Sequence, residues 1–505
     1  MSAVGSIVTN TGALEALNAI SNTASANNSL ESQLSSGLSI NSPADNPAGY
    51  ITAQGFTSQL NGLTQAISNA NQGVSLLQTA QGAITQQIGV VQQLNSIAVQ
   101  AANGTQTPAE SQSLQSLVSQ LTGQVNTIAT QTQFNNISLL NGAFSGVQFQ
   151  VGANEGQTQT LTIANLQSSA IGLNRSSASA AIYKNFGSGG GVVTTGTATA
   201  LPTTGAFTVS TATTPLSITG ASGKTATVAV GSTTESAATL ATAINNVAGT
   251  TGVQAQATTT ATFALSNTTA GSGFAFTIQA DKGGGAGTIG AAQSIVASSA
   301  AQVVSQVNGS SSTSGITASL NTAGDLVLTQ ASGDNIDITA VKAGVYTPVG
   351  GTTAGVPAGT ITGNATTPTS ALIQGQVQFQ SSGAFSVKNG SEIGLKTAST
   401  LTALSSINVS TTAGANTAIN VVKYALAALN NQGGQLGAVQ QALGANINNL
   451  NTTSQNLTSA LGVVQDANIP SVANKLTEAQ IQAQSGVAAL KSSTQLQQSY
   501  LSLLP

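Results

Sequence analysis

The chain has 505 residues, more than one compact core normally holds, so its length alone predicts two or more domains. It contains no cysteine, no histidine and no tryptophan. The composition therefore excludes disulfides, thiolate nucleophiles and zinc–thiolate sites, and it removes the commonest general base near neutral pH. We expect no catalytic residue, no metal ion and no cofactor.

Charged residues make up 5% of the chain, against roughly a quarter in ordinary globular domains. No lysine or arginine precedes Arg175, which argues against binding to nucleic acid or to an anionic membrane surface. Residues 46–109 are uncharged, but polar side chains interrupt them every few positions, so we expect no membrane insertion. The first residues lack the features of a secretory signal peptide, which leaves a cytoplasmic protein or one exported without such a signal.

The first zone, residues 1 to about 175, is rich in Gln, Asn and Leu. Apolar residues recur there at steps of three and four, at Leu60, Leu63, Ile67, Ala70, Val74 and Leu77. This spacing predicts a heptad seam, a narrow apolar stripe that a helix buries against a partner helix. An ordinary intramolecular bundle would show the same periodicity.

The middle zone, from about 176 to 410, is rich in Thr, Ser, Gly and Ala. Apolar and polar residues alternate in 207–209, 225–230, 326–328 and 377–379, which is typical of β-strands. Taken alone, this zone would also suit a Ser/Thr-rich surface adhesin.

Two segments of the middle zone look like copies of one unit. The matching residues lie 63 positions apart, and they are Ile244 with Val307, Asn245 with Asn308, Gly252 with Gly315, Val253 with Ile316 and Leu265 with Leu328. We expect each copy to form a short helix, at about 235–247 and 295–308, followed by a hairpin, within modules near 205–280 and 285–345. Chance similarity in a low-complexity background is the alternative.

Two acidic residues of the middle zone, Asp334 and Asp337, could be read as a metal site or an acid/base pair. The alternation in the segment DNIDIT favours a simpler interpretation, in which both carboxylates lie on a solvated strand face.

The last zone, from about 415 to 505, returns to the composition of the first. Its apolar residues continue the heptad spacing, at Val439, Leu443, Leu450, Leu457, Leu461 and Val464. Pro470 predicts a break, with Asn468 near the cap of a new helix that runs to about residue 498. Matched ends around a different middle indicate that the termini pack together and that the centre is an insertion.

Several short motifs stand at the two ends of the chain. Near the start they are LSSGLSINSPADNPAG (34–49), SQLNGL (58–63), NANQGVSLLQTAQGAI (69–84) and QFNNISLLNG (133–142). Near the end they are LGAVQQ (436–441), NNLNTTSQNL (448–457), AQIQAQSGVAAL (479–490) and LSLLP (501–505). In this order and spacing they resemble the two terminal regions of bacterial flagellins, and the central repeats are similar to modules often inserted in flagellins and hook-associated proteins.

The resemblance implies an α+β multidomain protein, with paired N- and C-terminal coiled-coil helices forming a helical stalk and a central inserted, mainly-β region. We expect N- and C-terminal helical polymerisation segments at 1–40 and 467–505. The helical domain would comprise 41–175, with a β-hairpin near 140–165, and 411–466. Residues 176–410 would form a variable surface region.

The function implied by the resemblance is that of a structural subunit of the bacterial flagellar filament, which serves swimming motility and is not an enzyme. Such a chain would be secreted unfolded by type III export and would self-assemble outside the cell. Its partners would be other copies of itself, an export chaperone at the C-terminal helices, the filament cap and the hook–filament junction proteins. A hook–filament junction protein with similar termini is the close alternative.

In flagellins, the segment matching residues 34–49 is associated with contacts between subunits, and we carry that role onto Leu34, Asn41 and Asp45. The whole suspected subunit interface consists of Leu34, Ile40, Asn41, Asp45, Leu63, Ile67, Val74, Leu77, Val439, Leu443, Leu450, Leu457, Leu461, Val464, Leu490 and Leu501.

The chain departs from the family mainly by losing charge. Positions where flagellins usually carry a charged residue hold amides here, among them Gln33, Asn46, Gln72, Gln81 and Asn468. Ion pairs fail in acid when carboxylates protonate, whereas apolar seams and amide hydrogen bonds do not titrate. The sequence therefore suggests the hypothesis that this filament stays assembled in acidic surroundings, with drift in a lineage under no pH pressure as the alternative.

Overall fold

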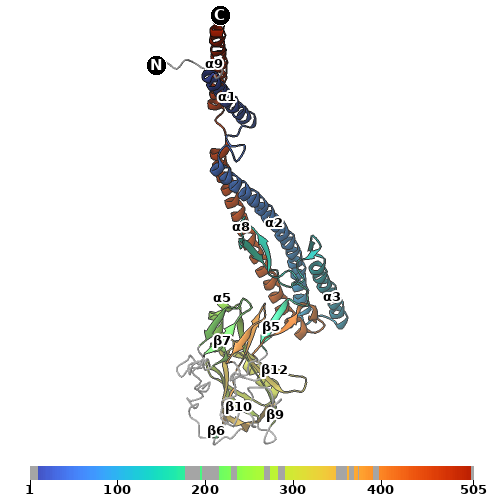
Figure 1. Ribbon diagram of the computed structural model, residues 1–505. Coiled ribbons are helices and arrows are strands. Elements are labelled where there is room, and N and C mark those ends of the chain that lie inside the picture. The colour runs from blue at the N-terminus through green and yellow to red at the C-terminus, as the bar shows by residue number, and fades with distance from the viewer. Residues whose placement is uncertain are drawn as a thin grey trace. The chain divides into compact units, whose positions relative to one another are not determined.

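The computed structural model describes residues 10–176, 194–195, 215–228, 236–266, 273–281, 291–348, 361–362, 369–373, 375–389 and 397–501. Long helices occupy both ends of this part of the chain, and a β-rich region lies between them in the sequence (Figure 1). This confirms the predicted α+β class with helical termini. The chain divides into two compact units, one of Met1–Gln78, Ser145–Thr162 and Leu436–Pro505, and one of Thr79–Phe144 and Ile163–Gln435.

The helices are α1 (Thr11–Ser36), α2 (Pro47–Ala101), α3 (Pro108–Gln131), α4 (Ala237–Asn246), α5 (Ala248–Thr251), α6 (Ala300–Gly309), α7 (Ser311–Ser314), α8 (Thr412–Gln465) and α9 (Ile469–Leu501). The predicted start of α9 is confirmed, since the Asn468 side chain accepts a hydrogen bond from the Ser471 N–H at 3.2 Å. No helix in the part of the chain that the structure describes is long and apolar enough to span a bilayer.

In the first unit, the predicted seam of α2 against α8 is confirmed at Leu63, Ala70 and Leu77, which are buried. Between them, Ala66 and Gly73 are buried, whereas the neighbouring Ile67 and Val74, which the spacing favoured, are only half-buried.

A Cβ placed on Gly73 would lie 3.2 Å from Leu443 Cδ1, so the small residues let the two helices approach closely. Sequence periodicity missed Ala66 and Gly73 because larger apolar residues stand next to them.

In the second unit, buried side-chain amides join helices α2 and α8 to residues 164–166. Gln87, on α2 and fully buried, donates from Nε2 to the carbonyls of Val125 and Leu166 at 3.0 and 3.2 Å. Gln432, on α8, accepts from the Ala164 N–H at 3.2 Å. These amides fix loop backbone against the helices without any charged group.

The strands are β1 (Gln133–Phe134), β2 (Ile137–Ser138), β3 (Val147–Gln150), β4 (Thr158–Leu161), β5 (Gly172–Ser176), β6 (Thr194–Thr195), β7 (Leu216–Thr219), β8 (Thr225–Val228), β9 (Gln254–Ser266), β10 (Phe274–Asp281), β11 (Gln293–Ala297), β12 (Ile316–Leu320), β13 (Leu326–Gln330), β14 (Asn335–Ala343), β15 (Val345–Pro348), β16 (Ile361–Thr362), β17 (Thr369–Ile373), β18 (Gln376–Ser381), β19 (Ser386–Lys388) and β20 (Thr400–Ala403). The predicted strands near 225, 326 and 377 are thereby confirmed, and the prediction for 207–209 lies outside the described residues.

The described strands of the second unit form three larger sheets. One runs β11-β10-β14-β17-β6, one runs β12-β13-β9-β18-β5-β20 with β15 and β16 joined beside β9, and one runs β19-β7-β8. Two apolar cores fill the space between these sheets and the short helices, one around Phe263 and Phe276 and the other around Leu240 and Phe379.

The internal repeat is confirmed, and the structure adds that one copy is inserted in the other. The order α4–α5–β9 recurs as α6–α7–β12, and Gly252 and Gly315 end the short helices with the same φ of 69°. The predicted hairpin is present in the second copy, where β12 pairs with β13. It is wrong for the first copy, because the strand beside the start of β9 is β18, which follows the whole second copy.

Two further expectations for this region are corrected. Residues 295–297 belong to strand β11 and not to the second helix, which begins at Ala300. Asp334 and Asp337 do not lie on a solvated face, because their side chains are buried, with 8% and 1% of their surface exposed. The Gln330 side chain donates to Asp334 at 3.0 Å, and the Gln279 side chain donates to Asp337 at 3.4 Å. Both carboxylates therefore have structural partners in the core.

Candidate functional site

The two terminal helices, α1 and α9, lie side by side in the first unit (Figure 1). Asn10 fixes the start of the pair, because its side chain accepts hydrogen bonds from the Ala13 N–H at 2.9 Å and from Ser493 Oγ at 3.2 Å. Further along, a Cβ on Gly486 would lie 3.0 Å from Ile20 Cγ1, so this glycine permits close helix packing.

The α1–α9 pair is too thin to cover its own apolar side chains. Every described residue of α1 keeps part of its surface exposed, and Leu17 is 54% exposed. Five large apolar side chains on the two helices are more than half exposed, and they are Leu14, Leu17, Ile481, Val487 and Leu496. We call these five residues the terminal apolar face. Another chain could cover apolar side chains that a thin helical pair leaves in solvent, so the face is a candidate for contacts between chains.

The sequence prediction missed the terminal apolar face, and in α9 it named only Leu490 and Leu501. Leu490 is half-buried in α9, and Leu501 is the last residue of that helix. Helices with many alanines and amides give weak apolar periodicity. The exposure of these five side chains could therefore be recognised only once the pairing of α1 with α9 was known.

Backbone hydrogen bonds tie the two segments that lead into the terminal pair. Leu38 and Asp466 form an isolated antiparallel bridge, in which the Ser39 N–H donates to the Gln465 carbonyl at 2.7 Å and the Ala467 N–H donates to the Gly37 carbonyl at 2.9 Å. The α1–α2 and α8–α9 connections are therefore fastened to each other. A change at either connection will be felt by both terminal helices.

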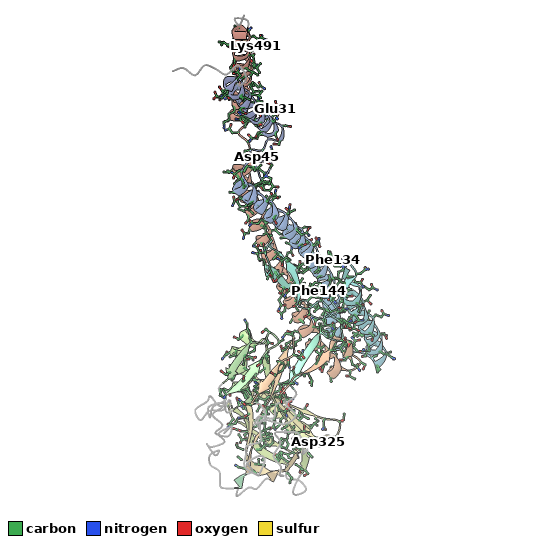
Figure 2. The ribbon with its side chains drawn as sticks, viewed as in Figure 1. Glu31, Asp45, Phe134, Phe144, Asp325 and Lys491 are labelled. Atoms are coloured by element: carbon green, nitrogen blue, oxygen red, sulfur yellow. The ribbon has the colours of Figure 1, made fainter. Side chains whose placement is uncertain are left out.

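The predicted contact segment forms a tight loop around Asp45 (Figure 2). One oxygen of this carboxylate accepts hydrogen bonds from the N–H groups of Asn41 and Ser42, at 3.0 and 2.8 Å, and from Ser42 Oγ at 3.1 Å. These bonds, chiefly that from the Ser42 backbone, lower the pKa of Asp45. Next to the loop, Ile40 is buried against Gly49, whereas Leu34 remains exposed.

The structure separates the other predicted interface residues into two groups. The side chains covered within one chain are Leu63, Leu77, Leu443 and Leu450, and those that stay half-exposed are Ile67, Val74, Val439, Leu457, Leu461 and Val464. Only the second group retains surface for a neighbouring chain. Two highly exposed residues were not predicted, Ile51 at 72% and Val463 at 87%.

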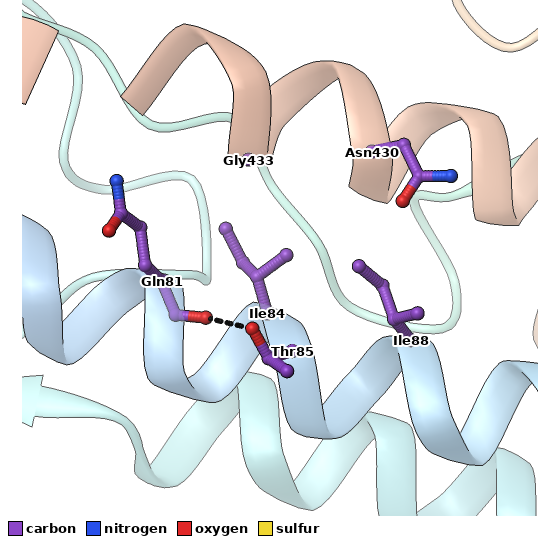
Figure 3. A pocket seen from close by; sticks show the side chains of 6 residues that line it. All are labelled: Gln81, Ile84, Thr85, Ile88, Asn430 and Gly433. Carbon is purple, nitrogen blue, oxygen red and sulfur yellow. Dashed lines mark hydrogen bonds between the residues drawn. The ribbon is translucent and has the colours of Figure 1, made fainter. Parts of the chain in front are cut away.

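A shallow groove of about 400 Å³ lies between α2 and α8 in the second unit (Figure 3). It is lined by Gln81, Ile84, Thr85, Ile88, Asn430 and Gly433. The Thr85 hydroxyl donates a hydrogen bond to the Gln81 carbonyl of its own helix at 2.9 Å. None of the six lining side chains ionises near neutral pH, so the groove offers packing surface and no acid or base.

Ionisable groups with shifted pKa values serve local structure. The Thr107 backbone and hydroxyl bind Glu110 in a capping box at the start of α3 and lower the pKa of that carboxyl. Burial raises the pKa of the Tyr424 hydroxyl, which donates to Gln254 Oε1 at 3.0 Å. Across the described residues there is no cluster of three or more side chains suited to hold a metal ion.

Two parts of the sequence match known family regions. Residues 7–145 match the bacterial flagellin N-terminal helical region, and residues 419–504 match the bacterial flagellin C-terminal helical region. A B-type flagellin of Pseudomonas aeruginosa is 34% identical over 516 residues, which cover 97% of this chain and 96% of that protein. A flagellin of Escherichia coli is 39% identical over 168 residues, 33% of this chain and 30% of that protein.

Two solved structures align over most of the chain with low scores. FliC from Burkholderia pseudomallei is 19% identical with a TM-score of 0.28, covering 74% of this chain and 99% of that one. FlgL from Xanthomonas campestris is 12% identical with a TM-score of 0.31, covering 80% and 98%. The full-length sequence relative and the two family regions at the chain ends show that this chain belongs to the bacterial flagellin family.

Proposed function

We propose that this chain, a structural subunit of the flagellar filament, joins its neighbours through the terminal apolar face. The carrying observation is that α1 and α9 pair with each other and still leave Leu14, Leu17, Ile481, Val487 and Leu496 in solvent. Covering these side chains with the same helices of neighbouring copies removes apolar surface from water, at about 25 cal/mol per Å². The half-exposed seam residues and the loop around Asp45 would add contacts beside them.

Assembly is coupled to ordering in this proposal. A two-helix pair with no fully buried side chain in α1 has little to hold it together in an isolated monomer. Burial against copies supplies the missing apolar contact, so the termini become ordered as the filament grows. The same weakness suits a chain exported unfolded through a type III apparatus, with a chaperone covering the C-terminal helices before export.

The filament cap and the hook–filament junction proteins are the further partners that this role implies. The close alternative is that the chain is itself a junction protein. The relative that matches nearly the whole chain is a flagellin, which favours the filament subunit. A surface adhesin would depend on the central region alone and would leave the terminal apolar face without a purpose.

The proposal is tested by placing a charge in the terminal apolar face. We expect Leu17→Glu, alone or with Ile481→Glu, to abolish filaments in electron micrographs of purified protein, because the carboxylate would have to lose its water. Leu17→Met should still assemble. Thr322→Glu, which adds the same charge in the exposed turn after β12, should assemble like the parent chain. Normal filaments from Leu17→Glu would contradict the proposal.

A further inference from the structure

The two largest sheets of the second unit each end in an outer strand beside helix α6. Among the described strands, β11 is the last strand of one sheet and β12 is the last strand of the other. An outer strand presents backbone N–H and C=O groups that can pair with a strand of another molecule. Flagellar subunits are packed at high local concentration, so open edges on each of them are a standing hazard.

Side chains of the two helices before β12 occupy outward backbone groups at the start and in the middle of this strand. The Asn308 carboxamide binds both backbone groups of Ala318, accepting from its N–H at 2.7 Å and donating to its carbonyl at 2.8 Å. The Ser314 hydroxyl accepts from the Ile316 N–H at 3.2 Å. The side chain of Asn308 thus makes the pair of bonds that a neighbouring strand would make.

Strand β11 is treated in the same way by another amide of α6. Gln306 accepts from the Val296 N–H at 3.0 Å and donates to the Val296 carbonyl at 2.7 Å. One residue beyond the strand, Gln302 accepts from the Ser298 N–H at 2.9 Å. The Val296 side chain is 69% exposed, so without this cover β11 would offer an apolar strand edge.

One helix reaches both edges because of its geometry. Gln306 and Asn308 are two residues apart, which places them about 200° from each other around the helix axis. Helix α6 contacts both β11 and β12, and its opposite sides therefore each present one carboxamide to one outer strand.

We infer that α6 blocks the β11 edge at Val296 and the β12 edge at Ala318, and so prevents copies of this chain from pairing strand to strand through these two edges. Neither carboxamide ionises, so the closure is independent of pH. It also requires no extra strand and no charged residue, which suits a chain with so few charges.

The first copy of the repeat shows the same device. Asn245 binds Ala255 with the same two hydrogen bonds, at 2.8 and 3.0 Å. This part of β9 pairs with β18 alone, because β13 pairs only with residues 259–263. Removing the Asn245 carboxamide would therefore also uncover strand backbone.

Helix α3 supplies a matched control. Gln115 donates to the Ile407 carbonyl at 3.3 Å and accepts from the Val409 N–H at 2.7 Å, and neither residue lies in a strand. Removing the Gln115 carboxamide costs a comparable pair of bonds, but it opens no strand edge.

The experiment is sedimentation velocity of the unassembled full-length chain, with hydrogen exchange to confirm that the β-rich region stays folded. We expect Asn308→Ala, and more strongly Gln306→Ala with Asn308→Ala, to shift the chain from monomer to dimers and larger species. Gln115→Ala should sediment like the parent chain. Because the readout is made before assembly, it does not depend on whether the terminal apolar face joins subunits.

A second variant separates edge pairing from unfolding. Ser319 is exposed on β12, and a lysine there discourages pairing between like edges. We expect Asn308→Ala with Ser319→Lys to return to the monomer position. The inference is overturned if Asn308→Ala stays monomeric while folded, if Gln115→Ala associates equally, or if the lysine fails to restore the monomer.

Discussion

At the scale of single residues, carboxamides carry out the fastening that charged side chains provide in most proteins. Gln87 holds two carbonyls in the helical core, and Gln115 of α3 binds the backbone at both Ile407 and Val409, at 3.3 and 2.7 Å. Asn308 does the same at a sheet edge. An amide offers a donor and an acceptor together, so one side chain can satisfy both backbone groups of a residue.

The contribution of Gln87 can be measured directly. Replacing it with methionine keeps the volume but leaves the buried carbonyls of Val125 and Leu166 without their side-chain donor. We expect Gln87→Met to lower the free energy of unfolding of the helical core by about 1–3 kcal/mol in urea titrations followed by circular dichroism. The exposed neighbour Gln86→Met should change it by less than about 0.5 kcal/mol.

The loop around Asp45 gives a pH-dependent prediction at the same scale. The pKa of Asp45 is lowered in the folded chain, so the ionised form stabilises the loop above the ordinary aspartate pKa of about 4. That stabilisation is lost as the pH falls through the lowered value. Hydrogen exchange at the Ser42 amide should show protection near neutral pH that disappears in acid, whereas Asp45→Asn should lack this pH dependence throughout. Equal behaviour of the two proteins would contradict the assignment.

At the scale of elements, sequence periodicity predicted the long helices and the seam between α2 and α8, but it named Ile67 and Val74 where Ala66 and Gly73 are buried. Large apolar residues dominate any sequence pattern, whereas close helix packing at Ala66 and Gly73 depends on their small size. The same limit explains why the terminal apolar face was missed, since exposure depends on what a helix packs against and not on its own spacing.

The seam predicts unequal effects for two apolar residues of α8. Leu443 is buried against α2, and we expect Leu443→Ala to destabilise the helical pair by about 2–5 kcal/mol, through lost burial and a cavity. Val463 on the same helix is exposed, so Val463→Ala should cost less than about 0.5 kcal/mol in the same denaturant titration. In an assembly assay we expect the opposite order of effects from these two substitutions, because only Val463 has exposed surface that a neighbouring chain could contact.

The pairing of strands in the sheets could not be predicted from the sequence. The constant offset of 63 residues exposed the repeat, because matching positions need matching side chains in the same local turns. It could not show that β9 pairs with β18, more than 100 residues later, because strand pairing is a non-local contact. Burial of Asp334 and Asp337 likewise depends on packing between distant segments, which local alternation does not show.

At the scale of the whole molecule, the chain carries 10 basic and 13 acidic residues in 505. Few ion pairs can then stabilise a filament, so protonation of carboxylates in acid removes little of its stability. We expect filaments of this chain to remain assembled at about pH 3, as judged by high-speed sedimentation and electron microscopy. Depolymerisation there, under conditions in which a charge-rich flagellin filament stays intact, would sink the hypothesis.

The nesting of one module within another has a consequence for how the β-rich region can change over generations. Because the start of β9 and β18 are neighbouring strands, everything between them departs from and returns to a single place on the first module. Genetic gain or loss of a whole module at that place would keep this pair of strands together. The sequence of the terminal helices would be unchanged by such an event.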